Sequence, residues 1–223
     1  MKNKILLTLF VGVFTFSFAQ AQTPVKFGVK AGLSNTGMRG DAVNNLSDLL
    51  DFTDGMVKTT NRNGFFAGGY VNIPLDNMLS FEPGIYYTQK GYNLAGEPNV
   101  KGFDFLGANA KAQLQSQYID IPVLLKADLG GFQIFAGPQF SYLVKSDLRM
   151  TAGVLGFNLL DRKIDATDQF NRWDAGITGG VGFNVSKNIN ISASYDYGLQ
   201  KVDANKNVNA YNRGFKVGIG VGF

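Results

Sequence analysis

Four carboxylates, Glu82, Asp120, Asp174 and Asp196, are the residues of this chain best suited to acid–base chemistry. Two carboxylates in a shared site can act as general acid and general base. The 223 residues include no histidine and no cysteine, which excludes a Ser–His–Asp triad, a thiolate nucleophile, a His- or Cys-ligated metal and a disulfide framework. Lysines share the faces on which the carboxylates fall, so we expect ion pairs and no enzymatic activity.

A second carboxylate group, Asp48, Asp51 and Asp54, lies in one polar connection. Hard cations such as calcium take carboxylate oxygens, but the spacing does not match an EF-hand loop. Leucines at near-helical spacing, among them Leu46 and Leu49, favour a short amphipathic helix on the rim instead. We therefore expect no metal and no cofactor.

The N-terminus predicts export. Lys2 and Lys4 precede an apolar run over 5–18, and Ala19-Gln20-Ala21 fits a small-x-small cleavage site. The run is shorter than the roughly 20 residues that a membrane-spanning helix needs. We predict a signal peptide over 1–21, cleaved after Ala21, and one domain over 22–223.

Eight segments of the mature chain alternate between apolar residues and polar or small ones, as β-strands with one apolar face do. They span residues 25–34, 65–73, 79–90, 118–126, 132–144, 173–185, 189–200 and 214–223. Each is close to the roughly 9–11 residues of a tilted transmembrane strand.

The connections between these segments alternate in length. Short ones span 74–77, 128–131 and 186–188, and long ones span 35–62, 91–116, 145–171 and 201–212. Alternating lengths and an even strand number are typical of outer-membrane barrels. The sequence therefore predicts an all-β fold: an eight-stranded antiparallel up-and-down transmembrane β-barrel with short periplasmic turns and long extracellular loops.

Charge decides which face meets lipid. The charged residues well inside the segments all fall on the non-apolar face: Lys26, Lys30, Glu82, Lys90, Asp120, Lys126, Asp174, Asp196 and Lys216. A basic residue facing lipid at mid-bilayer costs roughly 2–4 kcal/mol. Side chains fill the interior of an eight-stranded barrel, so we expect these residues to form a paired, structural charge network in the lumen.

Aromatic residues on the apolar face predict two interfacial girdles. The outer girdle comprises Tyr87, Tyr142, Trp173, Tyr195 and Tyr197, and the periplasmic girdle comprises Phe27, Phe81, Phe132, Phe183 and Phe223. The alternative is a secreted lipocalin-like barrel, but its apolar face would point inward around a ligand. The lipid-facing arrangement is the one that we predict.

Several motifs resemble those of Bacteroidetes outer-membrane β-barrel proteins of the porin family, also called PorT-like. They are the segments 25–32 (VKFGVKAG), 81–87 (FEPGIYY), 118–126 (YIDIPVLLK), 136–138 (AGP) and 173–183, together with the terminal Phe223. This resemblance implies an outer-membrane location and, for Phe223, a signal read by the barrel-assembly machinery. It implies no activity, because most members of the family have none assigned.

We therefore expect a non-enzymatic outer-membrane protein with a filled lumen and a structural or surface-binding role. Its expected partners are the lipid bilayer, the assembly machinery, and a surface or secretion partner bound through loops 35–62, 91–116 and 145–171. The third loop, with Leu160 before Asp161, could form an ordered lid or a partner contact. The alternatives are a narrow porin for ions or small solutes and an accessory barrel of a secretion machine. The sequence has no block of basic residues of the kind that would predict nucleic-acid binding.

Overall fold

The computed structural model describes residues 25–40, 57–96, 109–154, 157–204 and 209–223. These residues form nine strands and a short 3-10 helix: β1 (Lys26–Arg39), β2 (Val57–Pro74), β3 (Leu79–Gly96), β4 (Asn109–Asp128), β5 (Phe132–Val154), β6 (Phe157–Asp165), η2 (Thr167–Gln169), β7 (Trp173–Asn184), β8 (Ile189–Gly198) and β9 (Tyr211–Gly222). No helix within these ranges is long and apolar enough to cross a membrane. The predicted signal peptide and the Asp48–Asp54 region lie outside the described residues.

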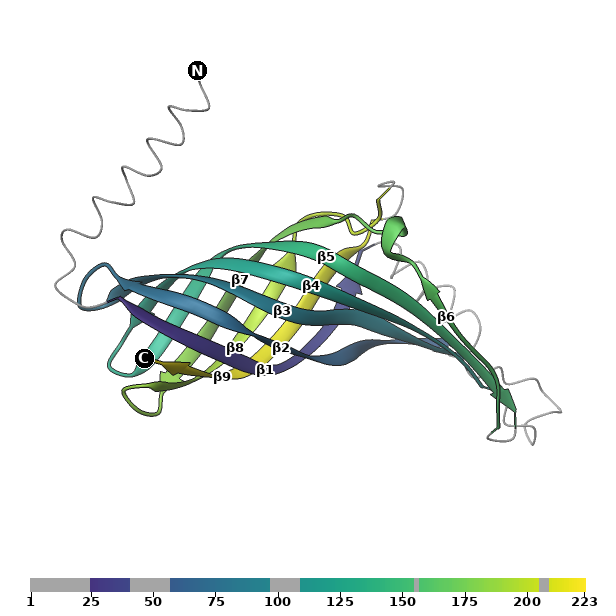
Figure 1. Ribbon diagram of the computed structural model, residues 1–223, viewed down its shortest axis with the longest axis horizontal. Coiled ribbons are helices and arrows are strands. Elements are labelled where there is room, and N and C mark those ends of the chain that lie inside the picture. The colour runs from purple at the N-terminus through teal and green to yellow at the C-terminus, as the bar shows by residue number, and fades with distance from the viewer. Residues whose placement is uncertain (1–24, 41–56, 97–108, 155–156, 205–208) are drawn as a thin grey trace, which may run out of the picture.

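Eight of the strands close into a barrel (Figure 1). β1 pairs with both β2 and β9, and the ring continues from β2 through β3, β4 and β5 to β7, β8 and β9, with every pair antiparallel. β6 pairs with β5 outside the ring. The predicted eight-stranded antiparallel up-and-down barrel is confirmed.

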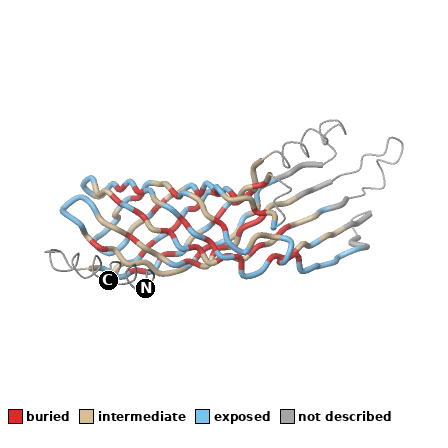
Figure 2. Tube along the Cα trace, turned by 90° about the horizontal axis from the view of Figure 1, so that it is seen from above, coloured by how far each residue is buried: buried red, intermediate tan, exposed pale blue. Residues whose placement is uncertain are grey.

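Buried and exposed residues alternate along the barrel strands (Figure 2), because successive side chains point to the lumen and to the outer surface in turn. In β9, Lys216 and Gly218 are buried, while Phe215, Val217 and Ile219 are exposed. An apolar outer surface around a polar interior inverts the arrangement of a water-soluble protein. The lipid-facing register that the charges predicted is the one observed.

Inward glycines make room for aromatic rings in the lumen. A Cβ on Gly28 would lie 2.3 Å from the ring of Tyr70, and one on Gly218 would lie 2.6 Å from the ring of Phe66. Each glycine thus provides space that a ring on the inner face of β2 fills. Crowding inside a narrow barrel explains why glycine recurs at inward positions.

The predicted long loops are shorter than expected, because the strands continue into them. β2 begins at Val57, β3 extends to Gly96, β4 begins at Asn109 and β5 extends to Val154. The strand register shifts between Asn61 and Phe66 and again at Gln117/Tyr118. After such a bulge, the residues that faced inward by sequence alternation face outward. The alternating pattern in the sequence therefore ends at the bulge, although the backbone pairing of the strands continues past it.

The 145–171 segment differs most from the prediction of a loop. Residues 157–165 form β6, which pairs with β5 to make a hairpin extending away from the barrel (Figure 1). A lid formed by this segment was therefore a wrong expectation. Polar residues such as Asp161 and Lys163 alternate with Leu160 and Ile164, a pattern that a two-sided strand in water also shows.

At the opposite end, short turns connect the strands. Asp76 Oδ1 accepts hydrogen bonds from the backbone N–H groups of Met78 (2.7 Å) and Leu79 (2.6 Å). These bonds hold the pKa of the Asp76 carboxyl below its ordinary value. The terminal Phe223 exchanges two backbone hydrogen bonds with Phe27 of β1, so the last residue completes the ring at this end.

Candidate functional site

The lumen holds eight of the nine predicted charged residues as buried side chains: Lys30, Glu82, Lys90, Asp120, Lys126, Asp174, Asp196 and Lys216. They come from six different strands, which places them on opposite walls of the barrel. Lys26, the ninth, is exposed at the short-turn end. Within the described part of the chain it forms no ion pair.

The first cluster of lumen charges is centred on Glu82. The Lys126 ammonium group donates a hydrogen bond to Glu82 Oε2, and the Lys30 ammonium group lies 3.5 Å from Glu82 Oε1. Lys30 also lies 5.1 Å from the centre of the Tyr70 ring. Two lysines sharing one carboxylate leave a net positive charge, which the ring partly stabilises.

The second cluster is a chain of four charges across the barrel. The ammonium groups of Lys90 and Lys216 each lie 2.8 Å from an oxygen of Asp120, and Lys216 lies 2.7 Å from Asp196. The Ser141 hydroxyl donates a 2.6 Å hydrogen bond to Asp120. Asp120 is fully buried, and a buried carboxylate is tolerated when pairing and hydrogen bonds replace its hydration. This cluster is charge-balanced.

Asp174 is less completely paired than the other lumen carboxylates. Its Oδ2 accepts a 2.8 Å hydrogen bond from the Asn212 side chain, but its Oδ1 is buried without a partner among the described residues. The same holds for the Thr88 hydroxyl. Small polar voids in a lumen of this kind suit bound water.

Sequence reasoning missed the residues that fill the space between the two clusters. Phe66, Tyr86 and Phe135 are buried inside the barrel, and the Phe66 and Tyr86 rings pack edge to face with centres 6.0 Å apart. The alternation of inward and outward residues in the sequence could have placed these side chains in the lumen. Their role depends on ring contacts across the barrel, which the sequence does not encode locally.

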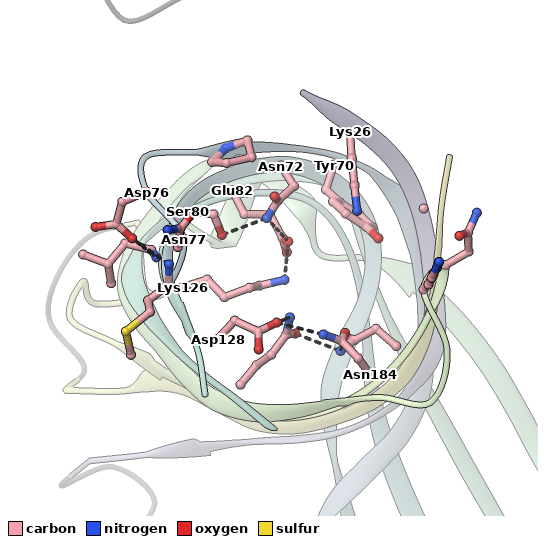
Figure 3. Close-up of a pocket in the computed structure, with 18 of the residues that line it drawn as sticks. Lys26, Tyr70, Asn72, Asp76, Asn77, Ser80, Glu82, Lys126, Asp128 and Asn184 are labelled. Carbon is pink, nitrogen blue, oxygen red and sulfur yellow. Dashed lines mark hydrogen bonds and ion pairs between the residues drawn. The ribbon is translucent and has the colours of Figure 1, made fainter. Parts of the chain in front are cut away.

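A cavity of about 460 Å³ opens at the short-turn end (Figure 3). Lys126 and Glu82 form its floor, and Asn72 donates a 2.9 Å hydrogen bond to Ser80 on one wall. On the facing wall, the Asn184 side chain donates a 2.9 Å hydrogen bond to Asp128. The cavity therefore ends at the Glu82 cluster, beyond which the lumen is filled by side chains.

Beyond the ring, strand extensions form what we call the projecting sheet, made of residues 57–61, 91–96, 109–116, 146–154 and 157–165. At about 3.3 Å per residue it reaches roughly 20–30 Å past the barrel. Its order is β2-β3-β4-β5-β6, with β6 at one edge (Figure 1).

The projecting sheet has two different faces. The face continuous with the lumen carries mainly apolar residues, namely Tyr92, Leu114, Ala112, Leu148, Met150, Ile164 and Leu160, but the register also places Arg162 on it, opposite Met150. Leu114 is buried, whereas Leu160 is 49% and Ile164 37% exposed. The opposite face carries ion pairs, including Arg149–Asp161 and Lys163–Asp147.

Neither the lumen nor the projecting sheet has the residues of a metal site. No group of three or more Asp, Glu, His or Cys residues that could hold a metal occurs in the described ranges. Three of the four lumen carboxylates, Glu82, Asp120 and Asp196, contact lysine ammonium groups. What the arrangement provides chemically is a rigid, charge-paired interior and an exposed sheet edge.

Comparison with known proteins agrees with this geometry. The family model described as an outer membrane protein beta-barrel domain matches residues 18–204. No curated protein matches the sequence. Similar solved structures include the attachment invasion locus protein Ail of Yersinia pestis (13% identity, 90% of this chain and 100% of that chain, TM-score 0.45). They also include Neisserial surface protein A (16%, 90% and 100%, 0.48) and OprG of Pseudomonas aeruginosa (12%, 92% and 98%, 0.44). The family match covers most of the chain, which therefore belongs to the outer-membrane β-barrel family of bacteria.

Proposed function

We propose that this protein is a non-catalytic outer-membrane barrel that binds a partner at the cell surface through its projecting sheet. The observation that carries this proposal is the edge strand β6. It pairs with β5 on one side, and along its other side no described strand pairs with it. A strand edge with unpaired N–H and C=O groups is a template for adding an extended peptide.

The exposed apolar residues support the same site. Leu160 and Ile164 lie on β6 at the far edge of the apolar face, where pockets for alternate side chains of an added strand would form. Long edge strands are usually blunted by charge or covered. Here Arg162 lies on the apolar face between Leu160 and Ile164, and Lys163 lies on the opposite face, so both faces of the edge carry charge against uncontrolled pairing. An edge that carries both charged and apolar side chains would bind a peptide that matches both, which makes the binding selective.

Four finer points belong to the same proposal. The N-terminal segment acts as a signal peptide removed after Ala21, and Phe223 acts as a signal for barrel assembly. The motif resemblance to Bacteroidetes PorT-like proteins supports a place within that group. The lumen charge network then has a structural role, holding opposite walls together.

In-cell photocrosslinking tests the surface-binding role. A photoreactive amino acid is placed at Leu160 on β6, and a matched control is placed at Val185 in the β7–β8 turn, which is similarly exposed. We expect a discrete adduct from position 160 that is absent from position 185. An identical set of adducts at both positions, or none at 160, would contradict the proposal.

A shortened hairpin provides the second arm. Leu148 and Ile164 are direct partners in the β5–β6 pairing, so residues 149–163 can be replaced by Asn-Gly, a two-residue hairpin turn. The crosslinker is placed at position 148, which both the full-length and the shortened protein contain. We expect an adduct from the full-length protein and none from the shortened variant, which should retain a folded barrel. Retention of the adduct would place the binding site elsewhere.

The narrow-porin alternative is tested by conductance. The ion pairs and aromatic rings between the walls support a closed lumen. Purified protein in planar bilayers is expected to show no reproducible single-channel steps. Steps whose size changes on Lys126→Ala substitution would favour the porin instead.

A further inference from the structure

The outer surface of β8, β9 and β1 carries a positively charged patch near the long-connection end of the barrel. We define the rim patch as Arg39 and Arg213 with the rings of Tyr197 and Tyr211. Arg39 and Arg213 occupy outward positions, since they share the alternation of the exposed Leu33 and Phe215. They are thus directed toward the membrane surface rather than the lumen.

The two arginines are close neighbours across one strand pair. Arg39 is the partner of Tyr211, and Gly37 is the partner of Arg213. Arg39 and Arg213 are therefore diagonal neighbours, for which separations of about 7–8 Å are typical. The intervening Gly37 has no side chain, and the Asn61 amide occupies the space beside it, since a Cβ on Gly37 would lie 2.3 Å from the Asn61 Oδ1 atom. A ligand shared by the two guanidinium groups would therefore also meet this amide.

Arg39 is held in place before any ligand binds. Its guanidinium carbon lies 3.9 Å from the centre of the Tyr197 ring and 4.7 Å from that of Tyr211. Its Nη2 donates a 2.8 Å hydrogen bond to the carbonyl of Gly198. Its Nε is enclosed and has no acceptor among the described residues. An enclosed donor without a partner is costly, and contact with the two rings holds the guanidinium group in one orientation.

The three strands that carry the patch, all within the described residues, offer no outward-facing carboxylate to pair with the two arginines. β1 and β9 contain no acidic residue, and Asp196, the one acidic residue of β8, points into the lumen. Neither arginine has an ion-pair partner in the described parts of the chain. The rim patch is therefore cationic on a face that otherwise avoids charge.

The level of the patch along the barrel identifies the ligand. Directly below it lie the apolar band, with Leu33 and Phe215, and the contact between the Tyr195 and Phe215 rings, whose centres are 5.5 Å apart. Aromatic girdles mark the boundary between acyl chains and headgroups. Beside the patch, Asn35 bonds the amides of Asn61 and Asn63, adding polar groups at the same boundary.

We propose that the rim patch binds the phosphate of a phosphorylated glycolipid in the outer leaflet. Arginine presents a planar fork of donors that matches phosphate oxygens, and the patch lies where a lipid headgroup would meet the barrel. The partner site proposed above lies at the β6 edge, on other strands than the rim patch, so the two proposals can fail independently.

Native mass spectrometry of purified protein tests the proposal. The protein is incubated with monophosphoryl lipid A, with the same lipid after removal of its phosphate, or with inorganic phosphate alone. We expect a lipid adduct on the wild type that falls at least fivefold in R39Q/R213Q, and at least fivefold when the lipid lacks phosphate. R213Q alone, which leaves the Arg39 stacking intact, is expected to fall by at least twofold.

The matched control, R162Q/K187Q, removes two positive charges away from the patch and should stay within twofold of the wild type. A heat-dependent gel shift verifies that each variant is folded. An adduct unchanged in both R39Q/R213Q and R213Q, or one that does not require the phosphate, would overturn the proposal. Binding of inorganic phosphate without a lipid adduct would overturn the assignment to a lipid.

Discussion

Asp120 is the residue on which the interior of this barrel most depends. It receives ammonium groups from strands on two sides, Lys90 of β3 and Lys216 of β9, and a hydroxyl from Ser141 of β5. These contacts join Asp120 of β4 to β3, β5 and β9, of which β9 is not a neighbour of β4 in the ring. Removing its charge leaves the buried Lys90 ammonium group without its ion-pair partner, while Lys216 keeps only Asp196.

We expect Asp120→Asn to lower the free energy of unfolding by about 3–5 kcal/mol, the usual cost of breaking a buried pair from one side. The measurement is urea unfolding in lipid vesicles. The control is Asp161→Asn, which removes a carboxylate of an exposed pair with Arg149 and should change the unfolding midpoint little. Equal effects of the two variants would contradict a structural role for the Asp120 cluster.

A second residue-level prediction concerns Asp76 in the β2–β3 turn. Hydrogen bonds from Met78 and Leu79 depress the pKa of its carboxyl below 3.8. A depressed pKa means that the carboxylate stabilises the turn at pH values above the ordinary pKa, and that this contribution is lost as pH falls through the lower, folded-state pKa.

The amide proton shifts of Met78 and Leu79 should therefore titrate with an apparent pKa below 3.8, as measured by NMR in micelles. In Asp76→Asn the amide oxygen can still accept hydrogen bonds, but the acid titration of these two signals should disappear. A titration that persists in the variant would show that another group is responsible.

At the scale of the strands, close approach of backbones decides which positions must be glycine. A Cβ on Gly32 would lie 2.0 Å from the carbonyl oxygen of Val217 and 2.5 Å from the Cα of Gly218. By contrast, a Cβ on Gly179, which faces outward on β7, would come no nearer than 3.8 Å to Phe135. The two glycines look alike in the sequence and differ in what lies beside them.

We expect Gly32→Ala to destabilise the barrel by about 1–3 kcal/mol, in the range for overpacking, while Gly179→Ala leaves the unfolding midpoint nearly unchanged. Urea unfolding of both variants in the same vesicles makes the comparison. If Gly179→Ala lowered the unfolding midpoint more than Gly32→Ala did, close approach of β1 and β9 would not explain the need for glycine at position 32.

At the scale of the whole molecule, ring closure between β1 and β9 determines how the protein behaves outside the membrane. Hydrogen bonds between the first and last strands join the two ends of the chain. A closed barrel has no free edges within the ring, so it resists detergent until heat opens it.

Unboiled protein from the outer-membrane fraction should therefore migrate differently from boiled protein in a denaturing gel. The shift should persist in the variant with a shortened β5–β6 hairpin, because β6 lies outside the ring. A protein recovered from the periplasm without a shift would contradict the membrane-spanning barrel. Loss of the shift in the hairpin variant alone would instead show that the projecting sheet is needed for closure.

The sequence by itself determined the barrel and its orientation toward lipid. Period-two alternation shows which residues share a face, and the cost of charge in lipid then decides which face points outward. Lys30 and Lys216 could therefore be placed in the lumen from sequence, as could the even number of strands. These inferences require only the local pattern of apolar and polar residues and the energetic cost of placing a charge in lipid.

Only the tertiary structure decided which charges meet and how far the strands extend. Lys90 and Lys216 are far apart in the chain, and both reach Asp120 because ring closure brings β3, β4 and β9 around one narrow lumen. Likewise, β6 and the projecting sheet arise from long-range backbone pairing that continues past bulges. Hydrogen bonds between strands follow neighbours in space, which alternation along one strand does not reveal.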